Sequence, residues 1–276
     1  MKRYDFKKTA EFVILCLIAV IQLFPLYWLI TFSFKNNQEI FSVNPIGLPQ
    51  VWRIQNYMDV FSNGKIGIYF INSVIVTAAT IAISSFISAM ASFAIARMKW
   101  KHSGKILTLF LMGLMIPLHA MLLPLFVFLK GVNLYNTYWA LVLPYVGIAI
   151  PMAIYIFVGF FNTLPKEMEE AACLDGCNIY RIFFHIMLPL IRPAIATVSI
   201  FTYLSSWNEL MFAITFISKE QFKTLTVGIM SMVGRYATNW GALGAGLLVA
   251  TLPTVIIYAL MSGEIQKSFT AGAVKG

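Results

Sequence analysis

The sequence predicts an all-α integral membrane protein with six transmembrane helices and a cytoplasmic loop between the fourth and the fifth. Composition is the first reason: of 276 residues, 59% are hydrophobic and 11% are charged, whereas soluble domains carry roughly 25% charged residues. The mean hydropathy of +0.80 agrees with this. The second reason is that the apolar residues form runs near or above the roughly 20 residues that cross a bilayer as a helix. We expect residues 1–276 to form one transmembrane domain.

The first two spans are the longest. The first, at about residues 12–34, follows a basic N-terminal stretch and is too long for the apolar part of a signal peptide, so we expect an uncleaved helix. A turn-rich external segment over residues 35–68 leads to the second span, at about 69–96. The second span is rich in serine and alanine, and such small residues let neighbouring helices approach closely in lipid.

The four remaining spans are expected at about residues 106–129, 137–161, 192–217 and 243–261. The third contains Pro117 and Pro124 and the fourth contains Pro144 and Pro151. A proline break inside a membrane helix is tolerated only where protein or a cavity satisfies the freed carbonyl groups. These two spans are therefore expected to lie against other helices or a translocation path.

The interval from 162 to 190 differs from the other connections because it reads as an amphipathic helix. Pro165 suits a first helical position, and the acidic residues that follow it favour the positive end of the helix dipole. Met168, Ala171 and Ala172 follow helical spacing and form a narrow face of small side chains. Gly176 permits a sharp turn, and a second helical piece runs on towards Pro189. A helix, a glycine bend and a helix together indicate a docking element, and residues 162–190 are called the docking loop below.

The spacing within the docking loop resembles the motif E-A-A-x3-G-x9-I-x-L-P of the membrane subunits of binding-protein-dependent ABC importers. The resemblance implies that the loop is the coupling helix, which seats in a groove of a separate ATPase. The motif positions are Glu170, Ala171, Ala172, Gly176, Ile186, Leu188 and Pro189, with Glu169 and Asp175 beside them.

Other stretches resemble the carbohydrate-importing branch of these permeases. They include Leu134-Tyr135-Asn136-Thr137-Tyr138, Trp207-Asn208-Glu209 and the ending Thr270-Ala271-Gly272-Ala273-Val274-Lys275-Gly276. The resemblance implies a second, different permease subunit, an ATPase dimer that uses ATP and magnesium, and an extracytoplasmic sugar-binding protein. It places the chain in a prokaryotic inner or plasma membrane, with no cofactor bound by this chain. The terminal Lys275 and Gly276 either reach the ATPase dimer or form a frayed end.

Basic residues set the orientation. With the N-terminus in the cytoplasm, thirteen of the 20 lysine and arginine residues fall on the cytoplasmic side, as the positive-inside rule requires. Both termini and the docking loop are then cytoplasmic. Because the basic residues flank the apolar runs, the net charge of +9 reflects topology and not binding of nucleic acid.

Glu209 is the carboxylate that lies deepest in an expected span. An ionisable group at that depth is costly and faces a cavity or a partner. With Trp207 and Asn208 it could bind a sugar, because hydroxyl groups take hydrogen bonds and sugar faces stack on aromatic rings; the alternative is a structural polar cluster that joins this helix to the partner permease. His119, between two prolines, either faces the translocation path or packs against a neighbouring helix.

The chain shows no signs of an enzyme. It contains no phosphate-binding G-x4-G-K-[S/T] motif and no convergent set of nucleophile, base or metal ligands. Cys173 and Cys177 have no histidine cluster that would complete a metal site, so no metal is expected. The rival functions are an ion-coupled secondary transporter, which would show inverted repeats and several intramembrane carboxylates, and a permease for a solute other than a sugar.

Overall fold

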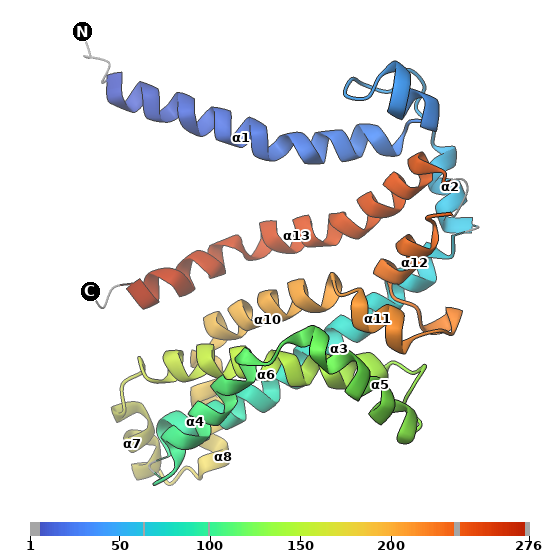
Figure 1. Cartoon of the computed structure of the whole chain (residues 1–276). Coiled ribbons are helices and arrows are strands. Elements are labelled where there is room, and N and C mark those ends of the chain that lie inside the picture. The colour runs from blue at the N-terminus through green and yellow to red at the C-terminus, as the bar shows by residue number, and fades with distance from the viewer. Residues whose placement is uncertain (1–5, 63, 99, 235–237, 274–276) are drawn as a thin grey trace. The chain divides into compact units, whose positions relative to one another are not determined.

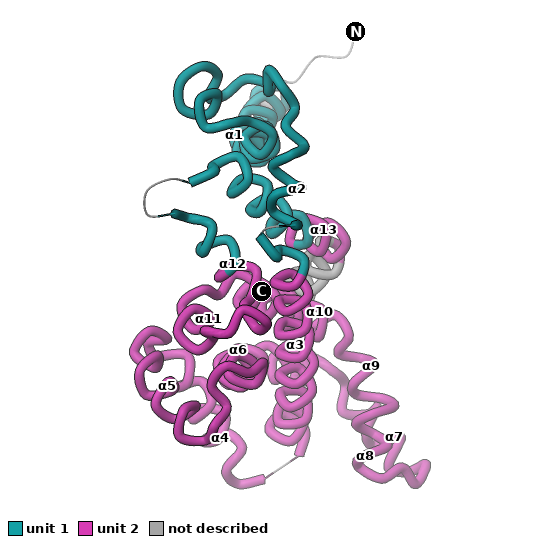
Figure 2. The backbone as a smooth tube through the Cα atoms, turned by 90° about the vertical axis from the view of Figure 1, so that its right-hand side faces the viewer, with its two compact units in different colours: residues 1–67, 228–253 teal, residues 68–227, 254–276 magenta. Residues whose placement is uncertain are grey.

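The computed structural model describes the whole chain except residues 1–5, 63, 99, 235–237 and 274–276 (Figure 1). The described residues contain helices and turns but no strand, so the all-α prediction is confirmed. They form two compact units, one of residues 1–67 and 228–253 and one of residues 68–227 and 254–276 (Figure 2). The prediction that residues 1–276 form one domain stays a prediction.

In the described residues, four helices are long and apolar enough to cross a membrane, and two bent helix pairs bring the number to six if each pair is one span. The four continuous spans lie in α1 (Phe6–Ser33), α3 (Ile66–Arg97), α6 (Trp139–Phe161) and α13 (Trp240–Ala273). The shorter α-helices are α2 (Gln55–Ser62), α4 (Ser103–Met112), α5 (Leu122–Gly131), α7 (Glu167–Leu174), α8 (Ile179–Ile182), α9 (Leu188–Leu190), α10 (Arg192–Trp207), α11 (Met211–Phe216) and α12 (Leu225–Ser231). Single turns of 3-10 or π-helix lie at Glu39–Val43, Gly113–Met115, Leu118–Met121, Phe183–Met187 and Glu220–Phe222.

The unit of residues 1–67 and 228–253 is built around a buried lysine. The ammonium of Lys35 donates to the carbonyls of Asn44 and Gly47 over 2.7 and 2.6 Å, and the side chain is fully buried. A Cβ atom at Gly241 would clash with the carbonyl oxygen of Lys35, so only glycine allows the start of α13 to approach this close. The external segment expected over residues 35–68 is thus a folded element with an interior of its own.

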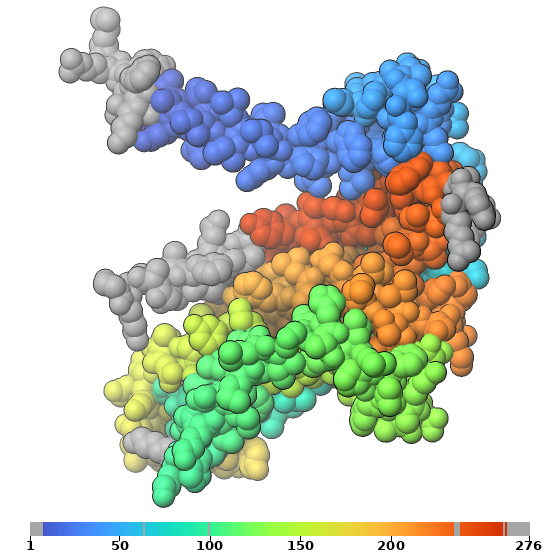
Figure 3. Space-filling view, viewed as in Figure 1, coloured from blue at the N-terminus to red at the C-terminus, as the bar shows by residue number. Residues whose placement is uncertain are grey.

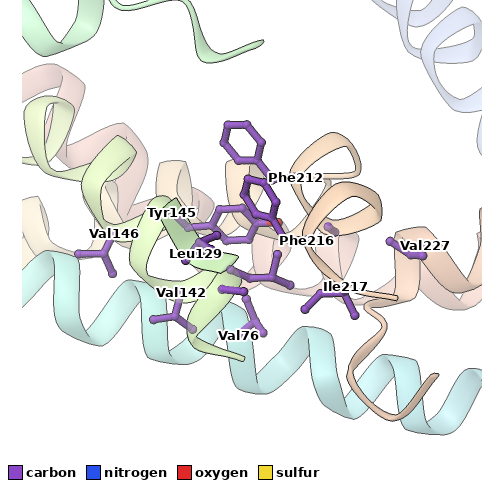
Figure 4. Close-up of a cluster of buried hydrophobic side chains, with 12 residues drawn as sticks. Val76, Leu129, Val142, Tyr145, Val146, Phe212, Phe216, Ile217 and Val227 are labelled. Carbon is purple, nitrogen blue, oxygen red and sulfur yellow. The ribbon is translucent and has the colours of Figure 1, made fainter. Parts of the chain in front are cut away.

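The larger unit, of residues 68–227 and 254–276, has a core where α3, α5, α6 and α11 meet. Val76, Tyr145 and Phe212 belong to a continuous cluster of buried apolar side chains, which Figure 4 shows. The rings of Phe212 and Phe216, one turn apart on α11, stack at 5.4 Å. Close packing of helices from distant parts of the sequence fixes the short segments between them.

The expected third span is bent and not continuous. The halves Ser103–Met115 and Leu118–Gly131 meet at 90°, where a single helix was expected over residues 106–129. Ile116 and Pro117 both adopt extended backbone at the bend. The cause is steric, because a proline ring disfavours the helical conformation of the residue before it and lacks the N–H that would continue the helix.

The expected fifth span, residues 192–217, is likewise interrupted. Helix α10 ends at Trp207, and α11 begins at Met211. At its other end, α10 makes an angle of 72° with the helical segment Ile179–Leu190. That segment continues through Pro189, where the sequence suggested an end, and the bend comes just before Pro193.

Helix α13 is longer than the expected span 243–261. It begins at Trp240 and continues to Ala273, so the segment from Thr270 starts as an extension of this helix. Lys275 and Gly276 lie outside the described residues, and their expected role at the ATPase stays a prediction.

Candidate functional site

The docking loop folds as a helix, a glycine turn and a second helix, at the end of the larger unit that also holds the C-terminus of α3 (Figures 1 and 2). Helix α7 carries Glu167, Glu169 and Glu170 in its first turn. Its C-terminus is closed by two hydrogen bonds of 3.0 Å, from the N–H of Gly176 to the carbonyl of Cys173 and from the N–H of Cys177 to the carbonyl of Ala172. This is the Schellman arrangement, which needs a left-handed residue after the helix.

Gly176 supplies that left-handed residue, with φ of +77°. A Cβ atom at this position would meet no heavy atom within 4 Å. The need for glycine is therefore conformational and does not arise from a close neighbour.

The second half of the loop is fastened to the membrane helices. Asn178 caps α8, since its side-chain oxygen accepts from the N–H of Arg181 over 2.9 Å. Behind the cap, Ile182, Phe183 and Met187 are buried in a cluster to which α3, α6 and α10 contribute. The motif residues Ile186 and Leu188 pack against the same cluster, and Pro189 is half-buried in α9. Ile186 and Leu188 thus hold the loop on its own chain.

The outer face of the loop is open to its surroundings. The space-filling view shows the loop (yellow) reaching the surface at the end of the larger unit (Figure 3). Glu170, Ala171, Asp175 and Gly176 are exposed, and Leu174 at the turn is 90% exposed.

The two alanines of the motif face opposite ways, which corrects the expectation that both belong to the docking face. Ala171 is exposed, whereas Ala172 is 5% exposed and belongs to the buried cluster beneath the loop. Adjacent residues on an α-helix point about 100° apart, so one of the pair can face the protein interior while the other is exposed.

Glu169 also turns towards its own chain. Its Oε1 accepts from Nε of Arg97 over 2.6 Å, and the two side chains are 18% and 4% exposed. In the sequence, Arg97 counts only among the basic residues that set the orientation. No local pattern marks this pair, because 72 residues separate its members.

The second candidate site lies at the break between α10 and α11. The carboxylate of Glu209 accepts from the N–H groups of Phe212 and Ala213 over 2.9 and 3.0 Å, and from the hydroxyl of Tyr145 over 2.6 Å. It therefore caps the N-terminus of α11, where unpaired N–H groups need an acceptor. Thr226 adds a hydrogen bond to the carbonyl oxygen of Glu209 over 2.8 Å. These contacts form a polar cluster within this chain.

A small cavity opens beside this cluster. It has a volume of about 90 Å³ and brings His119 together with Glu209. The hydroxyl-bearing residues Tyr145, Ser205 and Ser206 also line it, with Leu118, Ile148, Met211 and Phe212 as the apolar part.

Two of the expected site residues lie elsewhere. The ring of Trp207 is buried and packs at 5.5 Å against Tyr203 and at 5.6 Å against Phe70, and the side-chain amide of Asn208 bonds to the carbonyl of Leu204 over 2.9 Å. Neither residue lines the cavity beside Glu209. The sequence placed Trp207, Asn208 and Glu209 together because they are neighbours in the chain, but the helix end separates their directions.

A larger cavity of about 570 Å³ lies between the bent third span and α6. Its lining side chains are all apolar: Leu114, Ile116, Leu118, Met121, Leu125, Phe128, Leu129, Leu143, Pro144, Ile148 and Pro151, with Gly113 and Gly147. These side chains offer no hydrogen-bonding group to a hydroxylated solute. The smaller cavity beside Glu209, which has polar lining residues, is therefore the better candidate for a translocation path.

Within the described part of the chain, no group of three histidine, cysteine, aspartate or glutamate residues is placed to hold a metal ion. Cys173 and Cys177 are free thiols.

Comparison with known proteins identifies relatives over most of the chain. The family model described as "Binding-protein-dependent transport system inner membrane component" matches residues 86–267. The "Probable ABC transporter permease protein YurM" of Bacillus subtilis is 39% identical over 100% of this chain and 91% of its own length. The "Diacetylchitobiose uptake system permease protein NgcG" of Streptomyces coelicolor is 33% identical over 95% of this chain and 87% of its own length.

Among solved structures, a chain of a bacterial ABC transporter involved in the import of the acidic polysaccharide alginate superimposes with a TM-score of 0.83. The match covers 96% of this chain and 99% of that one. At 18% sequence identity this likeness shows a shared fold.

Proposed function

The chain belongs to the family of binding-protein-dependent transport system inner membrane components, and on that premise we propose that it is the permease subunit through which an ATP-driven importer passes a sugar or oligosaccharide. Family membership makes it a multi-pass membrane protein and a transport subunit, and implies a solute-binding protein and an ATPase as partners. We further propose what the solute is, that the docking loop contacts the ATPase, and that a second, different permease is present.

The carbohydrate part of the proposal is supported by what several relatives are named for. They include permeases of sulfoquinovosyl glycerol, diacetylchitobiose and arabinooligosaccharide systems. An ion-coupled transporter is the less favoured alternative, because the chain belongs to the binding-protein-dependent family. In addition, Glu209, the carboxylate deepest in the expected spans, has the structural task of capping α11.

The observation that carries the ATPase-coupling part is the two-sided structure of the docking loop. Its inner side is buried against three membrane helices, while Glu170, Ala171, Asp175 and Gly176 are exposed on its outer side. A short helix that is anchored on one side and open on the other can pass a displacement from a partner to the spans. We infer that the outer side receives the separate ATPase, which would use ATP and magnesium, and that a basic or hydrogen-bond-donating groove there accepts the charge of Glu170.

The translocation path is proposed to pass the cavity beside Glu209. His119 and the serines at 205 and 206 offer hydrogen-bonding groups to a hydroxylated solute. Glu209 contributes to the path mainly by stabilising the break between α10 and α11, since its two oxygens already accept three hydrogen bonds within the chain.

The remaining elements of the proposal concern assembly. Both termini and the docking loop lie in the cytoplasm of a prokaryotic cell, a second and different permease completes the path, and the last residues reach towards the ATPase dimer. The excess of basic residues on one side supports the orientation. An apolar window of 18 residues in α1 contains no residue that is buried within the chain, which is what a helix facing lipid or a second permease would show.

The test combines retention of the ATPase with uptake. Membranes carrying the tagged chain are solubilised, the ATPase that co-purifies is measured, and solute uptake is followed in vesicles with ATP and with an uncoupler. The proposal expects ATP-dependent uptake that the uncoupler does not abolish. Uptake that follows the ion gradient without ATP would support the secondary transporter instead.

A further inference from the structure

We propose that Arg97 is a positioning residue, which clamps the docking helix α7 to the cytoplasmic ends of α3 and α6 so that a displacement of α7 reaches both spans. The inference rests on the proposed function of the docking loop. It assigns a role in coupling to a residue outside the loop and its motif.

The guanidinium of Arg97 makes four hydrogen bonds that join three segments. Its Nε donates to Glu169 on α7 over 2.6 Å. Its Nη1 donates to the carbonyls of Phe161 and Leu164, each over 3.0 Å, and its Nη2 donates to the carbonyl of Pro165 over 3.1 Å. Arg97 itself is the last residue of α3. One side chain therefore ties the end of α3, the end of α6 and the first turn of α7.

The electrostatics suit a clamp. Phe161 is the last residue of α6, so its carbonyl lies at the negative end of the helix dipole and has no partner within the helix. It accepts from the N–H of Leu164 over 3.2 Å and has a second lone pair for Arg97. A cation at that end is favourable, and the planar fork of arginine can reach carbonyls and a carboxylate together, which the single ammonium of lysine does less well. With the side chain 4% exposed, water screens the ion pair weakly.

Because of the clamp, Glu169 and Glu170 on α7 have different roles. Glu169 is held inside the chain by Arg97, while Glu170 is exposed beside it. Substitution of either glutamate should therefore impair coupling for different reasons: Glu170 at the partner's surface, and Glu169 through the orientation of α7.

The experiment uses the transporter complex purified through a tag on this chain and supplied with magnesium and ATP. Cys173 on α7 is exposed, and after replacement of Cys16 and Cys177 by serine it can carry a spin label that reports the mobility of α7. We expect R97Q and E169Q each to make the label more mobile and to lower ATP hydrolysis per retained ATPase. The loss should be about tenfold in E169Q, the factor typical of losing one hydrogen bond between charged groups, and larger in R97Q, which removes the guanidinium and its four hydrogen bonds. R97K should fall between R97Q and the unaltered chain.

Non-additivity is the decisive readout. The double variant R97Q/E169Q should resemble R97Q alone, because both substitutions break the same contact. The matched control is K101Q, which removes an exposed positive charge from the turn that follows α3 and should change neither measurement. All values are taken per assembled complex, so a variant that only inserts poorly is not counted as uncoupled.

Two results would overturn the clamp. One is an immobile label with ordinary hydrolysis in R97Q and E169Q. The other is a reduced amount of complex whose hydrolysis and label mobility per complex stay unchanged, which would give Arg97 a role in folding alone. Failure of the proposed function looks different, because then the unaltered chain would retain no ATPase at all.

Discussion

The hydroxyl of Tyr145 donates to Oε2 of Glu209 over 2.6 Å, joining the N-terminal half of α6 to the break between α10 and α11. The two residues lie 64 positions apart, and both line the cavity that holds His119. The tyrosine thus determines where the carboxylate sits, and the carboxylate determines where α11 begins.

Removing this contact should weaken the fold less than removing the carboxylate. Y145F takes away one hydrogen bond to a charged acceptor, so the free energy of unfolding should fall by about 1.5–3 kcal/mol. E209Q should cost more, because an amide has one oxygen and cannot accept from both N–H groups of α11 and from the tyrosine.

Thermal unfolding in detergent measures both variants. The matched control is Y155F on the same helix, where the side chain is 58% exposed and should tolerate the change. Equal stability of Y145F, E209Q and Y155F would show that the contact does not hold the break.

Gly176 should be sensitive to backbone conformation and indifferent to side-chain volume. G176V forces a β-branched residue into φ of +77°, at a cost of about 1 kcal/mol or more. G176N should cost less, because asparagine enters the left-handed region more readily than other residues with side chains. Since no atom lies within 4 Å of the added Cβ, the order of retained ATPase should be Gly, then Asn, then Val.

G104V is the control for Gly176, since a Cβ atom there also meets nothing within 4 Å and φ is not positive. It should retain the ATPase like the unaltered chain. Equal losses in G176N and G176V would mean that the side chain obstructs the partner, and that the turn conformation is secondary.

The two alanines of the motif should respond in opposite ways. A172L places a larger side chain in the cluster beneath the loop, where overpacking costs typically 1–3 kcal/mol. A171L places it on the exposed face, so the free energy of unfolding should stay within about 0.5 kcal/mol of the unaltered chain while ATPase retention falls. Unfolding and co-purification measured on the same samples separate the two. If A171L unfolds earlier and A172L does not, the orientation of α7 is wrong.

Orientation can be tested with two single cysteines in a chain whose native cysteines are replaced. Lys166 and Lys219 are both exposed. Lys166 lies in the docking loop, and Lys219 lies between the fifth and sixth expected spans, which the proposed orientation places outside. An impermeant thiol reagent should label K219C in intact cells and K166C only after permeabilisation. Labelling of K166C from outside would invert the proposed topology.

The sequence predicted best those features that nearby residues determine. The docking loop follows from helical spacing, acidic residues in a first turn and a glycine at the bend, all within residues 162–190. The burial of Ala172 and the exposure of Ala171 were not predictable in this way, because the direction of α7 depends on packing against α3 and α6.

Features that depend on contacts between distant residues could not be predicted from the sequence. Prolines marked the third span for a break, but the 90° bend depends on how its halves pack. The interruption after Trp207 requires Glu209 to cap α11, and the position of Glu209 depends in turn on Tyr145. The pairing of Arg97 with Glu169 has the same origin, since it joins residues 72 positions apart.

The central claim is that the outer face of the docking loop meets a separate ATPase, and a photo-crosslinking residue in place of Leu174 tests it most directly. This side chain is 90% exposed at the tip of α7, and Met115, at 81% exposure on the bent third span, is the matched control position. Irradiation of intact cells should link position 174, but not position 115, to a chain whose peptides include a phosphate-binding G-x4-G-K-[S/T] motif. Crosslinks from position 174 to lipid or to an extracytoplasmic protein, with no such ATPase among the products, would contradict the account.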